Sequence, residues 1–100
     1  MIQLPAAPTH TEGWTFLTNH AHVLFCLAQD PSMRLRDVAT HVGITERAAQ
    51  RIVAELAQEG YVTVKKDGRR NTYRIRDKKK LRHHLESNVT IRALLDLVGP

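Results

Sequence analysis

The residues of this 100-residue chain best suited to chemistry with a partner are its cations, and most of them fall in one short window. Ten of the 15 lysines and arginines lie within residues 65–82, where only Asp67 and Asp77 oppose them. The window therefore carries a net charge of +8 and the rest of the chain −3. Such segregation suits a surface that faces phosphates, because neutralising phosphates releases their condensed counterions. A solvated charge run or a disordered basic tail is the alternative.

The six histidines are poorly spaced for metal binding. His20 and His22 lie two residues apart and so do not share a helix face, and His83 and His84 are adjacent. A site assembled across a dimer from His84, Glu86 and a histidine of a second chain is the alternative. The sequence also contains no glycine-rich phosphate loop, nucleophile elbow or paired-carboxylate motif. We therefore expect no metal, no cofactor and no catalytic residue, and a protein that is not an enzyme.

The composition favours a single globular domain in the cytoplasm. Apolar residues make up 42% and charged residues 25% of the chain, as in ordinary globular proteins. The one cysteine, Cys26, cannot form an internal disulfide, and in its apolar surroundings it is typical of a core residue. A redox role for its thiol is the alternative. Neither a secretory leader nor a run of about 20 apolar residues occurs, so we expect no membrane association.

The chain before the basic window has apolar residues at helical spacing. The first stretch begins at Thr18, which can cap a helix, and ends at the break formed by Asp30-Pro31-Ser32. Its inner face is predicted to consist of Ala21, Leu24, Phe25 and Ala28. Residues 1–13 before it are rich in proline and small polar residues, and are predicted to be a flexible lead-in.

Two further helices are predicted with a very short connection. The first has an apolar face made of Leu35, Val38, Ala39 and Val42. It ends at Gly43, and Ile44 alone separates that glycine from Thr45, the expected cap of a helix over residues 45–59. The second helix turns inward Ala49, Ile52, Val53 and Leu56. Two helices joined by so tight a glycine turn form a helix-turn-helix unit.

After Gly60 the apolar period changes from helical to two. The alternation through Val62 and Val64, and again through Tyr73 and Ile75, predicts a β-hairpin over residues 62–76. The dipeptide Asp67-Gly68 is a turn signal, and we expect the hairpin tip to span residues 65–71.

Residues 78–98 are predicted to be helical again, in two pieces. Leu81 and Leu85 mark the first piece. Thr90 is the expected cap of the second, whose apolar stripe consists of Ile91, Leu94, Leu95 and Val98.

The segment from Arg34 to Ile75, RLRDVATHVGITERAAQRIVAELAQEGYVTVKKDGRRNTYRI, resembles the winged helix-turn-helix family, particularly the small MarR-like and ArsR-like regulators. The resemblance covers about two fifths of the chain and rests on the spacing of residues 35–62, continued into Gly68-Arg69-Arg70-x-x-Tyr73. It implies a mainly α fold with a small β-hairpin (α+β), a winged helix-turn-helix domain over 14–77 and a C-terminal helical segment over 78–100. It also implies a transcriptional regulator that binds double-stranded DNA and is associated with the nucleoid.

Carried over to this chain, the resemblance makes 45–59 the recognition helix, which enters the major groove. The residues on its outer side are Thr45, Glu46, Arg47, Ala48, Gln50 and Arg51. Arg69 and Arg70 at the hairpin tip are expected in an adjacent minor groove, with Lys65, Lys66 and Arg74 on phosphates. The alternatives are ordinary solvent exposure of the helix face and a charged turn that blocks strand association.

One recognition helix reads one half-site, so we also expect a homodimer. Its predicted interface consists of Trp14, Leu17, Leu94, Leu95 and Val98. The alternative is that the last helix packs on its own domain. Two other functions stay open: a winged-helix adaptor that binds proteins, and a repressor that responds to a metal or a small ligand.

Overall fold

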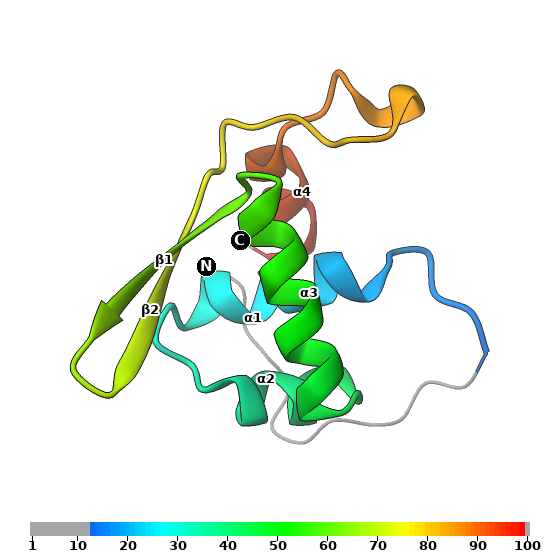
Figure 1. The fold of residues 1–100 in the computed structure, drawn as a ribbon. Helices are drawn as coiled ribbons and strands as arrows, with labels where there is room; N and C mark the ends of the chain where they lie inside the picture. Colours follow the sequence, from blue (N-terminus) through cyan, green and yellow to red (C-terminus); the bar gives the residue numbers. More distant parts are fainter. Residues whose placement is uncertain (1–12, 100) are drawn as a thin grey trace.

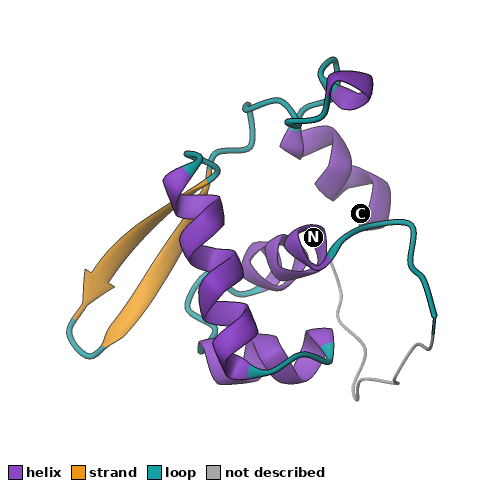
Figure 2. Cartoon of the chain, turned by 45° about the vertical axis from the view of Figure 1, so that its right-hand side comes forward, coloured by secondary structure: helices purple, strands orange, loops and turns teal. Residues whose placement is uncertain are grey.

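The computed structural model describes residues 13–99, so the predicted lead-in lies outside the described residues except for Gly13. The helices are α1 (Asn19–Gln29), α2 (Leu35–Val42), α3 (Glu46–Gln58) and α4 (Ile91–Val98), and the strands are β1 (Val62–Asp67) and β2 (Arg70–Ile75). Helices α1, α2 and α3 pack together, and the hairpin extends away from them to one side (Figure 1). Helix α4 lies on the other side of α3 from the hairpin (Figure 2). The prediction of a mainly helical fold with one small hairpin is confirmed.

The core lies between the first three helices and includes side chains from the hairpin and from α4. Its largest fully buried side chains are Leu27, Ile52, Val23 and Val38. The predicted inner face of α3 is confirmed, because Ala49, Ile52, Val53 and Leu56 are all buried. Tyr73 of β2 and Ile91 of α4 belong to the same cluster of buried side chains. One core therefore holds α3 and the hairpin in a fixed relation.

The prediction for α1 was partly wrong. Phe25 and Ala28 are only half-buried, whereas Val23, Cys26 and Leu27 are buried. The reason is that α1 contacts α2, α3 and β2, so it is covered on more than one side. Thr18 does stand at the N-cap position, but its side chain forms no capping hydrogen bond.

The turn between α2 and α3 is as tight as the sequence predicts. Gly43 ends α2 in the left-handed region, with φ of 86°, and its N–H donates to the carbonyl of Ala39 over 2.8 Å. A side chain at this φ is strained, which explains the glycine. Two residues later, the hydroxyl of Thr45 accepts from the backbone N–H of Ala48 at 3.0 Å and caps α3. These two local interactions set the start of α3.

The hairpin is more regular than predicted. Its strands run to Asp67 and from Arg70, so the tip is the two-residue turn Gly68-Arg69 and not the whole of residues 65–71. Gly68 has φ of 65°. Positive φ at the first central residue alone is typical of a type II′ turn, whose twist matches that of the strands. The strand pairing therefore continues almost to the end of the hairpin and keeps it straight and extended.

The prediction of a helix in the first of the two C-terminal pieces was wrong. Residues 78–90 form an irregular loop with one 3-10 turn at His84–Glu86, and Leu85 is 78% exposed. Only two apolar residues, four apart, favoured a helix here, while Lys78 and Arg82 place like charges at the same spacing, which destabilises one. The backbone instead pairs with itself, with the N–H of Leu81 donating to the carbonyl of Val89 at 2.9 Å. The second piece is confirmed as α4, capped by the hydroxyl of Thr90, which accepts from the N–H of Ala93 at 3.1 Å.

Candidate nucleic-acid interface

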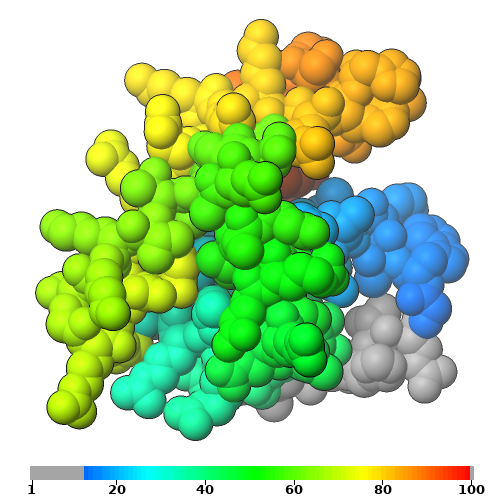
Figure 3. All heavy atoms as spheres, in the orientation of Figure 1, coloured from blue at the N-terminus to red at the C-terminus, as the bar shows by residue number. Residues whose placement is uncertain are grey.

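The outer face of α3 is free of the protein's own chain over the described residues. Thr45, Glu46, Arg47, Gln50 and Arg51 are exposed on the side opposite the buried face. Ala48, also predicted for this surface, is half-buried. Figure 3 shows α3 running down the front of the molecule with no other segment across it, and the hairpin beside it on the same face. This geometry lets α3 and the hairpin meet one flat or grooved partner together.

The two arginines of this face differ in how they are held. Arg51 is 62% exposed, and its Nη1 donates to Oε1 of Glu55 at 3.3 Å. Arg47 forms no ion pair within residues 13–99. Gln50 donates from Nε2 to Oε2 of Glu46 over a long 3.5 Å. Because α3 contains two arginines and two glutamates, its net charge is zero and it attracts phosphates only weakly.

The hairpin supplies the positive charge that α3 lacks. In its register Lys65 pairs with Thr72 and Arg74 with Thr63, so these two cations lie on the same outer face. Lys66 pairs with Asn71 and points to the opposite face, beyond the edge of the core. Arg69 lies in the turn itself. All four of these predicted cations are exposed.

Arg70 has a partner inside the chain. Its Nη2 donates to the backbone carbonyl of Ser32, in the loop between α1 and α2, at 2.6 Å. The same loop holds the outer edge of β2, where the N–H of Tyr73 donates to the carbonyl of Pro31 at 2.8 Å. These two bonds tie the hairpin to the helical core, a role that the sequence did not reveal because the partners lie 38 and 42 residues apart.

A comparison of the sequence with models of known protein families agrees with this geometry. A family model described as winged helix-turn-helix DNA-binding matches residues 18–63, from the N-cap of α1 to the beginning of β1. The chain contains a winged helix-turn-helix DNA-binding domain. No curated protein matches the chain. Membership of the MarR-like or ArsR-like subgroup stays a prediction.

The cations of the basic window, residues 65–82 of the winged helix-turn-helix domain, are not all free to meet a partner. Beyond the hairpin, its cations are partly engaged within the chain. Lys79 places Nζ 5.2 Å from the ring centroid of Tyr61, a cation–π contact. Arg82 pairs with Glu59 at 3.5 Å. The hairpin, or wing, is therefore the part of the window with the most cations that face solvent without such a contact.

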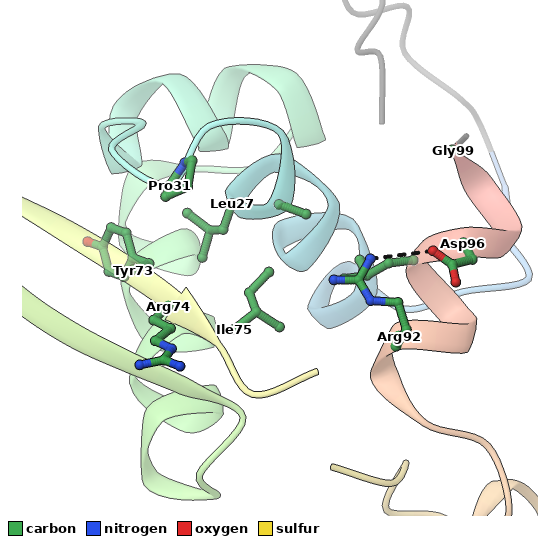
Figure 4. A pocket seen from close by; sticks show the side chains of 10 residues that line it. Leu27, Pro31, Tyr73, Arg74, Ile75, Arg92, Asp96 and Gly99 are labelled. Atoms are coloured by element: carbon green, nitrogen blue, oxygen red, sulfur yellow. Dashed lines mark hydrogen bonds and ion pairs between the residues drawn. The ribbon is translucent and has the colours of Figure 1, made fainter. Parts of the chain in front are cut away.

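A cavity of about 370 Å³ lies between the base of the wing, the end of α1 and α4. In Figure 4 the side chains of Leu27 and Ile75 line its apolar wall, and Arg92 faces it from α4. Arg92 is bound to two carboxylates: Nη2 lies 2.8 Å from Asp77 and Nη1 lies 3.4 Å from Asp96. The hydrogen bond from Arg92 holds the pKa of Asp77 below its ordinary value. The pair with Asp77 joins the segment after β2 to α4, whereas the pair with Asp96 lies within α4.

Among the described residues, Cys26 lies in the core, and several of the histidines contact other side chains. Cys26 is 2% exposed, and burial raises the pKa of its thiol to about 11, which confirms the prediction of a core residue. Residues 13–99 contain no cluster of three or more histidine, cysteine or carboxylate side chains that could hold a metal ion. The rings of His83 and His84 stack with centroids 4.4 Å apart. His20 binds Glu55, a contact that no sequence signal indicated.

The residues predicted for a dimer interface divide into two groups. Leu94 and Leu95 are only 9% and 4% exposed, because α4 turns them into its own domain. For these two side chains the alternative of packing within the domain holds. Leu17 is half-buried, while Trp14 and Val98 are exposed. Leu97, which the sequence analysis missed, is exposed as well, so an apolar surface on α4 and before α1 is still open to a partner.

No helix in residues 13–99 is long and apolar enough to cross a membrane.

Proposed function

We propose that this protein is a sequence-specific transcriptional regulator that binds double-stranded DNA and is not an enzyme. The observation that carries the proposal is the two-sided character of α3: one face is buried, and the opposite face presents exposed polar side chains next to a basic wing. An α-helix fits the major groove of B-DNA, and side chains in its first turns reach base edges. We expect the protein to be associated with the nucleoid in the cytoplasm.

The exposed residues of α3 and its N-cap are expected to divide into those that contact bases and those that contact phosphates. Arg47 or Arg51 can donate two hydrogen bonds to O6 and N7 of guanine, and Gln50 can pair with adenine. Ala48 is small enough to allow close approach or to contact a thymine methyl group. Thr45, at the N-terminus of α3, is suited to a phosphate contact.

The wing supplies affinity. Lys65 and Arg74 on its outer face, with Lys66, are suited to grip phosphates and so carry little sequence information. Arg69 at the turn is the residue best placed to enter a minor groove, where narrow A·T tracts concentrate negative potential. Arg70, although predicted with it, is held by the carbonyl of Ser32 and acts on DNA indirectly, through the position of the wing.

The proposal includes a homodimer, because one domain presents one recognition helix and tight specific binding needs two half-sites about one helical turn apart. The exposed Trp14 and Val98, with the half-buried Leu17, are the predicted residues still available to a second copy. With four DNA-bound cations per domain, Lys65, Lys66, Arg69 and Arg74, a bound dimer is expected to show a slope of log K against log salt of about −7.

The test begins with selection of bound sequences from a random duplex pool, which reports DNA binding, site sequence and half-site symmetry together. The selected duplex and a random one are then titrated with wild type, Arg51→Ala and Lys65→Ala. We expect Arg51→Ala to lower the ratio of specific to random affinity, and Lys65→Ala to lower both affinities alike. Equal losses from both changes on both duplexes contradict the assigned roles. A chain that ignores duplex DNA at low salt and binds a protein is an adaptor instead.

A second candidate function, a ligand-responsive repressor, is favoured by a cavity of about 330 Å³ beside the C-terminal end of α3. Its lining is mostly apolar, with Leu24, Leu56 and Leu94 from three helices, and it includes the charged side chain of Arg82. This volume falls within the range of small-molecule sites. Thermal unfolding with zinc, nickel or small aromatic acids tests it. No stabilisation by any of them leaves a constitutive regulator.

A further inference from the structure

We propose that Glu55 and His20 set the sequence selectivity of the domain by holding the guanidinium of Arg51 in one position on the outer face of α3. This inference rests on the proposed function, in which Arg51 contacts a base. Neither Glu55 nor His20 needs to touch DNA, so both are positioning residues.

The three side chains form a chain of polar contacts that spans two helices. Nε2 of His20, on α1, lies 2.8 Å from Oε1 of Glu55, on α3. Nη1 of Arg51 donates to the same carboxylate, at 3.3 Å from Oε1 and 3.5 Å from Oε2. Arg82 and Glu59, paired with each other, border the same hollow beside the C-terminal half of α3. Glu55 is thus the shared acceptor of one side chain from the core helix and one from the recognition face.

The carboxylate of Glu55 is ionised at neutral pH and so can serve both partners. The hydrogen bond from His20 lowers its pKa most, and the charge of Arg51 lowers it further. A glutamate bound only by an arginine one turn away on an exposed helix would be mobile, since such pairs contribute little. His20 comes from another helix, 35 residues away in the sequence, and fixes the carboxylate relative to the core.

This tertiary support distinguishes Arg51 from the other polar residues of the face. Glu46, the partner of Gln50, is bound only across one turn and at 3.5 Å, and Arg47 has no ion pair within the described part of the chain. Arg51 is therefore the arginine whose position is set before DNA arrives. Fixing a side chain in advance reduces the entropy lost when it binds in that position, and disfavours binding elsewhere.

The charge of Glu55 works in the same direction. A carboxylate at the interface repels the phosphates of every sequence alike, so it lowers affinity without reading bases. A guanidinium freed from it can reach any nearby phosphate and bind random DNA well. The tie therefore favours selectivity at the expense of overall affinity, by combining an attractive contact with a repulsive one.

The experiment compares Glu55→Gln and His20→Ala with wild type on the selected duplex and on a random duplex, using fluorescence anisotropy at fixed salt. We expect Glu55→Gln to bind the random duplex more tightly and to lower the ratio of specific to random affinity about fivefold, the lower end of what one base contact supplies. His20→Ala should lower the same ratio. Glu59→Gln is the matched control, because it removes the same charge from the end of α3 without touching Arg51. It should leave the ratio unchanged.

The outcomes separate this inference from the proposed function. If Arg51→Ala leaves the ratio unchanged, the base contact is wrong and the inference falls with it. If Arg51→Ala lowers the ratio but Glu55→Gln behaves like Glu59→Gln, the base contact stands and only the inference is overturned. Thermal unfolding checks that each variant is folded. Should one of the two variants fail to fold, the other tests the same tie.

Discussion

The tether between Arg70 and Ser32 predicts that two neighbouring arginines of the wing have different roles. Arg69 lies in the turn with its side chain exposed, whereas Arg70 donates to the carbonyl of Ser32 at 2.6 Å. If the tether holds the wing against the helical core, Arg70→Ala lowers both the stability of the domain and the affinity for every DNA sequence. Arg69→Ala lowers DNA affinity alone. Each change removes one positive charge, so they control for each other.

The expected magnitudes follow from the contact and its exposure. A hydrogen bond to a charged group contributes about 1.5–3 kcal/mol, but solvent screening at this exposed site reduces it to about 0.5 kcal/mol. For a domain of this size that loss corresponds to a fall in Tm of about 2–4 °C. Loss of one bound cation that neutralises phosphate charge, whether it lies on the backbone or in a groove, makes the slope of log K against log salt less negative by about 0.9. Arg69→Ala should show this change in slope, and Arg70→Ala should show much less.

Two measurements test the prediction. Thermal unfolding by circular dichroism gives the change in Tm, and anisotropy titrations of a fixed duplex at four or more salt concentrations give the slope. Arg70→Lys serves as a further variant that keeps the charge and loses the guanidinium fork. The reasoning is refuted if Arg70→Ala changes the slope as much as Arg69→Ala does while leaving Tm unaltered, since Arg70 would then be a phosphate contact and not a tether.

Three other predictions follow from single residues. Gly43→Ala places a side chain at φ of 86° and should cost about 1 kcal/mol, measured as a shift of the urea midpoint; an unchanged midpoint contradicts the strained turn. Cys26, buried with its pKa raised to about 11, should react with a thiol reagent only on unfolding, and rapid labelling of the native domain argues against a core position. The pKa of Asp77 is lowered in the folded domain by Arg92, so the pair stabilises the fold above the unfolded value of about 3.9 and ceases to do so as pH falls through the folded value. Asp77→Asn should flatten this acid limb of the Tm profile, and an identical profile rules the pair out.

The elements that could be predicted from the sequence are those fixed by local signals. Gly43 and Thr45 set the end of α2 and the start of α3 through bonds that reach no further than four residues. The apolar spacing of α3 identified its buried face, because that helix has one side against the core and one in solvent. Helix α1 could not be predicted as well, since it is covered on several sides and its period carries less information.

The parts of the candidate site that sequence reasoning missed depend on contacts between distant segments. In the sequence Arg70 looks like a free cation, and only the fold shows that its guanidinium lies 2.6 Å from a carbonyl of the loop after α1. In the sequence His20 has no visible partner, and only the packing of α1 against α3 places it beside Glu55. Leu81 and Leu85 suggested a helix because spacing alone does not show that only Leu81 finds the core to pack against. Chemistry that arises from tertiary contacts leaves no periodic trace in the sequence.

Under the proposed function, the distribution of charge separates affinity from selectivity between two elements. Helix α3 has no net charge, so it gains little from phosphates and must rely on the fit of its polar side chains to bases. The wing carries cations with few internal partners and attracts any duplex. Moving a single charge between the two elements should therefore trade one property for the other. An Arg51 freed from Glu55 makes α3 more like the wing, and a shortened or untethered wing leaves α3 with too little affinity to use the selectivity it has.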